Sequence, residues 1–153
     1  MKQNNDEAIK LLLADEWQLL QKSILSLNQS FLKCKSIGKK TEYSFEEQES
    51  FDSLSSKFNR TSDIFTQKVL RTTWMLLHES FVPFIDMMNV AEKMGIIHHA
   101  NEMIIIRDLR NQITNEYIPE ALIELIPEIL ELCPVLIANI QYCEQFLLKR
   151  AWI

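Results

Sequence analysis

Only two glycines and four prolines interrupt this chain of 153 residues. Glycine and proline are the residues that most often end or bend a helix, whereas the abundant Leu, Ile, Glu, Lys, Gln and Met favour one. The sequence therefore predicts an all-α protein with long helices. A chain of this length is large enough for one hydrophobic core, so we expect a single domain over residues 1–153.

Apolar residues recur at steps of three and four along the chain, as they do on the buried face of a helix. The first predicted helix is capped by Asp6 and ends near Gly38, because glycine readily takes the left-handed conformation after a last helical turn. Pro83 is suited to the first position of a shorter helix, which we expect to stop at Gly95.

A second long helix is predicted from about Ser44 to Leu77. Ser44 and Glu47 have the S-x-x-E spacing of a capping box, in which each residue hydrogen-bonds the backbone of the other. Residues 59–62 include Asn, Thr and Ser, which favour caps and turns, so we expect this stretch to loosen the helix locally.

The last helix is predicted to begin at Pro119. Pro127 and Pro134 each remove a backbone donor, so a kink or break is expected near one of them. Together these segments predict an antiparallel up-and-down four-helix bundle with an extra short helix.

The most informative residues lie at the end of a predicted helix that begins near His98. Its apolar stripe consists of Met103, Ile106, Leu109 and Ile113. Arg110 falls at the edge of this stripe, with Arg107 and Thr114 on the polar side. A partly desolvated guanidinium is costly unless an anion or several acceptors meet it. Arg110 is therefore expected to have a partner, which is a carboxylate, a group of carbonyls or a ligand phosphate.

Residues 110–117 read Arg-Asn-Gln-Ile-Thr-Asn-Glu-Tyr. This stretch resembles the R-N-x-x-x-H motif, often followed by x-Y, of HEPN domains (higher eukaryote and prokaryote nucleotide-binding). The helical pattern of residues 51–146 is most similar to HepT-like toxins and nucleotidyltransferase substrate-binding proteins. The resemblance implies a homodimeric subunit of toxin–antitoxin type, with a nucleotidyltransferase partner protein and nucleotide or RNA as the ligand.

The resemblance also implies roles for individual residues. Arg110 would face the phosphate, and Asn111 would shape the site beside it. Arg107 and Thr114 would complete the phosphate- or nucleotide-binding surface. Tyr117 would be the tyrosine that partner nucleotidyltransferases adenylylate in some members.

Arg110 and Asn115 are the catalytic candidates, and the chain departs from the family motif at the second of them. The family has a histidine general acid/base where Asn115 stands. An amide has no usable titration near neutral pH, so it cannot serve as a general acid/base. The metal-independent ribonuclease activity that the intact motif implies is thus expected to be weak or lost.

The same residues also suit a purely structural role. An arginine near a helix C-terminus complements the macrodipole, an asparagine tolerates a left-handed cap, and Tyr117 can pack under the turn before Pro119. The alternative function is then a non-catalytic helical protein–protein interaction module. Its binding surface would use the Met-rich and Trp-bearing segments, namely Met87, Met88, Met94 and Trp152.

The net charge of −5 argues against broad binding to nucleic acid, whose affinity comes mainly from neutralised phosphates. Any RNA contact needs a local basic cleft, for which Arg60, Lys68 and Arg71 are candidates. The lysine cluster at residues 33–40 carries no interleaved aromatic residues and is expected to be a solvated turn.

No metal site and no cofactor is predicted. The three cysteines are an odd number without C-x-x-C spacing, and no Glu-x-x-His pair of the di-metal type is present. His98 and His99 are adjacent, and adjacent side chains on a helix point about 100° apart, so the two histidines cannot easily bind one metal ion together.

The sequence also predicts a cytoplasmic protein without a membrane segment. Unpaired cysteines fit a reducing compartment, and the N-terminus lacks the features of a signal peptide. The most apolar stretch, residues 121–140, contains three glutamates and two prolines, which a spanning helix does not tolerate.

Overall fold

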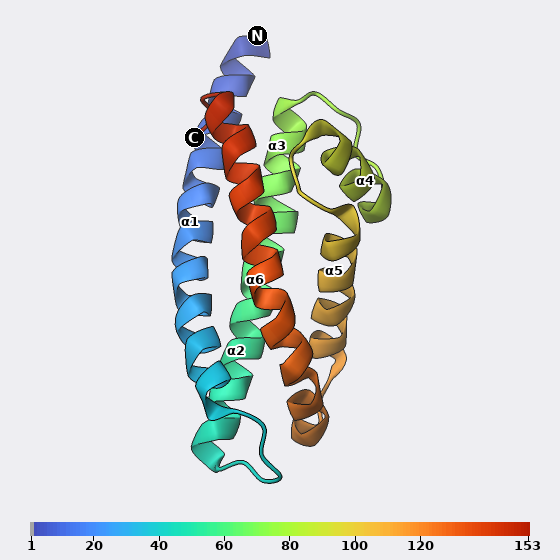
Figure 1. The fold of residues 1–153 in the computed structure, drawn as a ribbon. Helices are drawn as coiled ribbons and strands as arrows, with labels where there is room; N and C mark the ends of the chain where they lie inside the picture. Colours follow the sequence, from blue (N-terminus) through green and yellow to red (C-terminus); the bar gives the residue numbers. More distant parts are fainter. Residues whose placement is uncertain (1) are drawn as a thin grey trace.

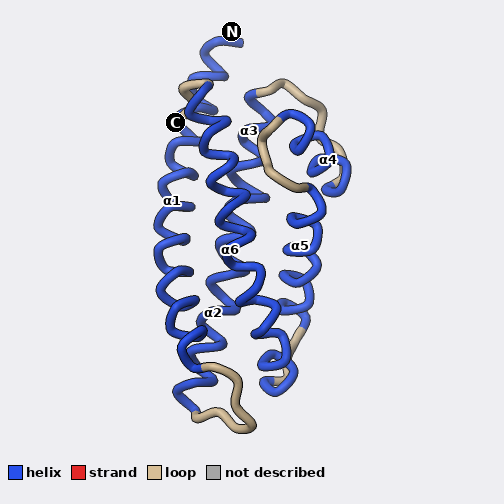
Figure 2. Tube along the Cα trace, in the orientation of Figure 1, coloured by secondary structure: helices blue, strands red, loops and turns tan. Residues whose placement is uncertain are grey.

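The computed structural model describes residues 2–153, and over this range the chain is all-α without a strand, as predicted (Figures 1 and 2). The elements are α1 (Lys2–Ile37), α2 (Phe45–Asp63), the π-helix η1 (Ile64–Val69), α3 (Leu70–Leu76), α4 (Phe84–Met94), α5 (Ala100–Asn115) and α6 (Pro119–Lys149). α2, η1 and α3 follow one another without interruption, and we call them together the α2–α3 rod. In Figure 1, α1, the α2–α3 rod, α5 and α6 run along the long axis, and α4 lies beside one end of α5.

Two helices end at the predicted glycines, but the first helix does not begin at the predicted acidic residue. Gly38 and Gly95 have positive φ angles of 74° and 79° and terminate α1 and α4, as predicted. The prediction that Asp6 starts the first helix is wrong, since α1 already begins at Lys2. The carboxylate of Asp6 instead lies 3.1 Å from Nε2 of His78. A tertiary contact has therefore replaced the local cap.

The capping box at the start of α2 is confirmed. The backbone N–H of Glu47 donates to Ser44 Oγ at 3.1 Å, and the backbone N–H of Ser44 donates to Glu47 Oε1 at 2.9 Å. Lys40 also donates to the Glu47 carboxylate, and this hydrogen bond lowers the pKa of Glu47. The connection between α1 and α2 is thus fixed at its end by local contacts.

The second long helix is irregular at a different place from the one predicted. Residues 59–62 are regular α-helix, and the chain widens into the π-helix η1 directly after Asp63. Ile64, Phe65 and Val69 of η1 are all buried. Such wide turns are uncommon and occur frequently at functional sites.

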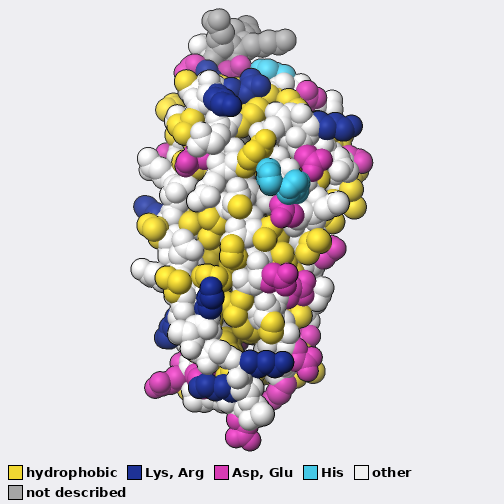
Figure 3. Space-filling model, viewed as in Figure 1, with side chains coloured by type: hydrophobic (Ala, Val, Ile, Leu, Met, Phe, Trp, Pro, Cys, Tyr) yellow, Lys and Arg dark blue, Asp and Glu magenta, His cyan; other side chains and the backbone are white. Residues whose placement is uncertain are grey.

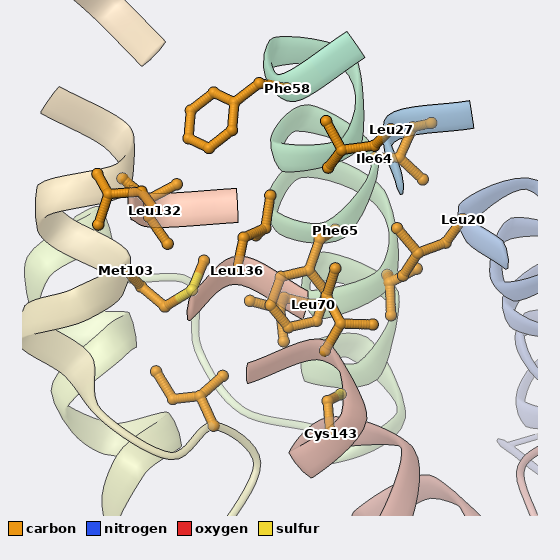
Figure 4. Packing of buried hydrophobic residues seen from close by; sticks show 14 of the residues in the cluster. Leu20, Leu27, Phe58, Ile64, Phe65, Leu70, Met103, Leu132, Leu136 and Cys143 are labelled. Carbon is orange, nitrogen blue, oxygen red and sulfur yellow. The ribbon is translucent and has the colours of Figure 1, made fainter. Parts of the chain in front are cut away.

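The core draws on all the long helices. Figure 4 shows side chains from α1, η1, α3, α5 and α6 converging on one apolar cluster, including Leu20, Leu27, Phe65, Leu70, Met103 and Leu136. The predicted apolar stripe of α5 is confirmed, because Met103, Ile106, Leu109 and Ile113 are all buried.

α6 runs continuously through Pro127 and Pro134, so neither proline breaks it. Its buried residues recur on both sides of Pro134, from Ile126 to Leu147, and α6 contacts α1, α2 and α5. We attribute the continuity to this packing, which offsets the lost backbone hydrogen bonds. None of the helices described here combines the length and apolar character needed to span a bilayer.

The three cysteines are unpaired and buried. Burial raises the pKa of Cys133 and of Cys143 to about 12, since desolvation disfavours the thiolate. The thiolate is the reactive form, so these two side chains should be chemically inert in the folded protein.

We therefore expect Cys133 and Cys143 to react with a disulfide reagent at pH 8 only as fast as the protein unfolds. Peptide mapping by mass spectrometry after timed labelling measures this, with guanidinium-unfolded protein as the fully reactive control. Complete labelling of either residue within seconds under native conditions contradicts the expectation.

Candidate functional site

The motif residues occupy the last turns of α5 and the linker after it. α5 ends at Asn115, and Glu116 adopts an extended conformation with φ −92° and ψ 117°. Ile118 is also extended, as expected for the residue before a proline. Arg110 and Asn111 thus lie on a rigid helix, while Tyr117 lies in the connection between two helices.

Arg110 forms a bidentate ion pair with Asp63 at the end of α2. Its Nε donates to Oδ1 and its Nη2 donates to Oδ2, each at 2.8 Å. The two side chains are 26% and 32% exposed. Hydrogen bonding to Asp63 raises the pKa of Arg110 further above its usual range. The predicted partner of the half-buried guanidinium is therefore a carboxylate of the same chain.

Asn59 joins the same two helices one turn before Asp63. Its Nδ2 donates to Thr114 Oγ1 at 3.2 Å and to the backbone carbonyl of Arg110 at 3.4 Å. Thr114 Oγ1 in turn donates to that carbonyl at 3.0 Å. Thr114 is thus part of the α2–α5 interface, where it satisfies and fixes the backbone around Arg110.

A shallow pocket of about 530 Å³ opens beside the ion pair. We call it the Arg60 pocket, and it is lined by Arg60, Asp63, Ile64, Gln67 and Lys68. Gln67 and Lys68 of this lining belong to the π-helix η1. Two of the three basic candidates for a shared cleft therefore lie in one pocket. The third, Arg71, stacks instead over the ring of Phe81, with Cζ 4.8 Å from the ring centroid.

A second pocket, of about 550 Å³, lies at the last turns of α5. We call it the amide pocket, and it is lined by Asp108, Asn111, Gln112, Asn115, Glu116 and Leu125. Its described lining contains two acidic residues and no basic one. Asn111 and Asn115 share this face because they are four residues apart on a helix. Asn115 thus lines this pocket, and Arg110 does not.

Two predicted site residues point elsewhere. The guanidinium of Arg107 stacks over the ring of Phe84 in α4, with Cζ 4.2 Å from the centroid. Arg107 therefore anchors α4 to α5 and lines neither pocket. Tyr117 is 89% exposed, so its ring does not pack under the turn.

Asp63 is the site residue that the sequence did not reveal. It precedes Arg110 by 47 positions and belongs to no motif. The sequence indicated only that Arg110 needs an anion. Comparisons with protein-family models, with curated proteins and with solved structures find no match to this chain.

The ion pair should couple α2 and α5 energetically. Removing either partner leaves the other charge half-buried, so Asp63→Ala and Arg110→Ala should each lower the free energy of unfolding. In a double-mutant cycle we expect a coupling energy of about 1–2 kcal/mol. Urea denaturation of the two single variants and the double variant measures it. A coupling below about 0.3 kcal/mol contradicts a structural role for the pair.

Proposed function

We propose that this protein is a HEPN-like subunit that works with a minimal nucleotidyltransferase and binds the phosphate groups of a nucleotide or RNA. The observation that carries the proposal is that Arg60 and Lys68 share one pocket with Asp63, the carboxylate that holds Arg110. The pocket also adjoins the part of α5 in which the sequence resembles the HEPN motif.

The local charge supports an anionic ligand. Arg60 and Lys68 line the pocket with Asp63, and Asp63 pairs with Arg110, so these four residues carry a formal charge of +2 in a chain of net charge −5. Asp63 binds Nε and Nη2 of Arg110, and Nη1 lies outside this pair. Guanidinium groups suit phosphate oxygens because they are planar, multidentate and always charged.

The amide pocket suits a different role. Its acidic residues, Asp108 and Glu116, disfavour a phosphate there. We propose that a cleft containing both Arg110 and Asn115 forms between two copies of the chain, with their α5 helices facing each other. We include this homodimer in the proposal, together with an up-and-down four-helix bundle as the arrangement of α1, the α2–α3 rod, α5 and α6.

Tyr117 completes the proposed partnership. Its side chain is almost fully exposed, in an irregular linker between two helices. An enzyme that modifies a side chain needs such access, and a tyrosine at this motif position is adenylylated in some members of the family that the sequence resembles. We propose that Tyr117 is presented to the active site of the nucleotidyltransferase.

The alternative, a non-catalytic interaction module, finds support on a different surface from the one predicted. Met88 is buried in the core, and Trp152 packs on Phe146 with 6.3 Å between ring centroids. α1, in contrast, exposes a row of leucines, namely Leu11, Leu12, Leu19, Leu25 and Leu32. Under this alternative, changes in the Arg60 pocket leave partner binding unaffected.

Phosphate binding can be tested with ATP and with a fluorescent 5′-phosphorylated RNA of ten nucleotides. We expect the variant with both Arg60→Ala and Lys68→Ala to bind whichever probe is bound by the natural protein at least tenfold more weakly, as measured by calorimetry or anisotropy at low salt. Arg71→Ala is the matched control, since it removes a neighbouring cation that stacks on Phe81. Equal losses in the control and in the double variant, or no loss in either, contradict the proposed pocket.

Nuclease activity should depend on the residue at position 115. We expect little cleavage of total RNA by the natural protein in the presence of EDTA. Asn115→His should increase the cleavage rate by about 10²-fold or more, because it restores a general acid/base. Gel analysis of RNA fragments over time measures the rate. Robust cleavage by the natural protein without a gain in Asn115→His contradicts this expectation.

A further inference from the structure

His98 and His99 lie together on the surface between α4 and α5. They precede the helix, and His99 is its N-cap residue with an extended backbone of φ −139° and ψ 119°. The helical separation of about 100° therefore does not apply to them. Their ring centroids are 3.9 Å apart. The sequence-based reason for excluding a shared metal ion fails, because it assumed that both residues are helical.

Glu102 brings a carboxylate to the same place from the first turn of α5. One ligand atom from each of His98, His99 and Glu102 lies within 4.8 Å of the other two. Two imidazoles and a carboxylate are a ligand set that binds zinc in proteins and keeps a further coordination position open. Exposed side chains such as these histidines can close the remaining distance by small rotations.

A buried asparagine of α6 supports these three side chains through hydrogen bonds. Asn139 is fully buried, and its Oδ1 accepts hydrogen bonds from the backbone N–H groups of His98 at 3.0 Å and of His99 at 3.3 Å. Its Nδ2 donates to Glu102 Oε1 at 3.2 Å. One side chain thus fixes the backbone of both histidines and the carboxylate. Supporting hydrogen bonds of this kind orient the ligands of metal sites.

A second acidic residue increases the negative charge around the histidines. Glu92 Oε1 lies 3.8 Å from Nδ1 of His99 and accepts the backbone N–H of Ala100 at 3.0 Å. On the other side, the ring of Tyr142 lies 5.2 Å from that of His98. Figure 3 shows histidine side chains among acidic ones on the exposed face. Two carboxylates together match the charge of a divalent cation, and the imidazole nitrogens are ligands that suit zinc-class metals.

We propose that His98, His99 and Glu102 bind one divalent transition-metal ion of the zinc class, with a coordination position open to solvent. The site lies at the opposite end of α5 from Arg110, eleven residues or about 16 Å away along the helix. It is independent of the proposed phosphate pocket, and either can fail without the other.

The test is titration of the 153-residue protein, first freed of metal with a chelator, with Zn²⁺ by calorimetry and with Co²⁺ by visible absorption. We expect one ion per chain with micromolar affinity, and a Co²⁺ spectrum without the intense near-ultraviolet band of thiolate ligation. His98→Ala, His99→Ala and Glu102→Gln should each weaken binding at least tenfold. His78→Ala is the matched control, because it removes the only other histidine.

Three outcomes overturn the proposal. The first is no binding of Zn²⁺ at about 1 mM, a concentration that would saturate a micromolar site. The second is undiminished binding by the three variants, and the third is a thiolate band that identifies cysteine ligands. Circular dichroism of each variant shows whether the helices remain intact. Because all three substitutions are at surface positions or on a partly exposed carboxylate, their helical content should match that of the natural protein.

Discussion

The bidentate contact between Arg110 and Asp63 joins the end of α2 to the end of α5, and the geometry of the candidate site depends on it. A guanidinium at the edge of an apolar stripe has few ways to remain charged at low cost, and a carboxylate that meets two of its nitrogens is the most effective. The pair fixes which way Arg110 points. Arg60 of α2 and Lys68 of η1 line the pocket to which Asp63 also belongs.

α5 is held at both ends by an asparagine from a neighbouring helix. Near its C-terminus, Asn59 of α2 binds Thr114 and the carbonyl of Arg110. At its N-terminus, Asn139 of α6 binds the backbone of the two histidines and the carboxylate of Glu102. An amide both donates and accepts, so it can satisfy backbone and side-chain groups together. Each end of α5 is thus tied to a neighbouring helix, one beside Arg110 and the other beside the two histidines.

Charge distinguishes three surfaces of the molecule: the Arg60 pocket on α2 and η1, and two others at the two ends of α5. The Arg60 pocket is basic, the amide pocket is acidic, and the histidine cluster combines two imidazoles with carboxylates. The net charge of the whole chain does not predict the local charge of any of these surfaces. Overall composition controls long-range attraction, whereas recognition of a phosphate or a metal ion depends on the few groups within hydrogen-bonding or coordination distance.

The sequence by itself determined the all-α class, the ends of helices at Gly38 and Gly95, the capping box at Ser44 and the buried stripe of α5. Each depends on residues within about four positions of one another. It also determined that Arg110 needs an anionic or polar partner. Only the tertiary structure decided that this partner is Asp63, that the helix widens after residue 63, that α6 continues through its prolines, and that the adjacent histidines converge. These outcomes depend on which distant helices pack together, and local periodicity carries no information about that choice.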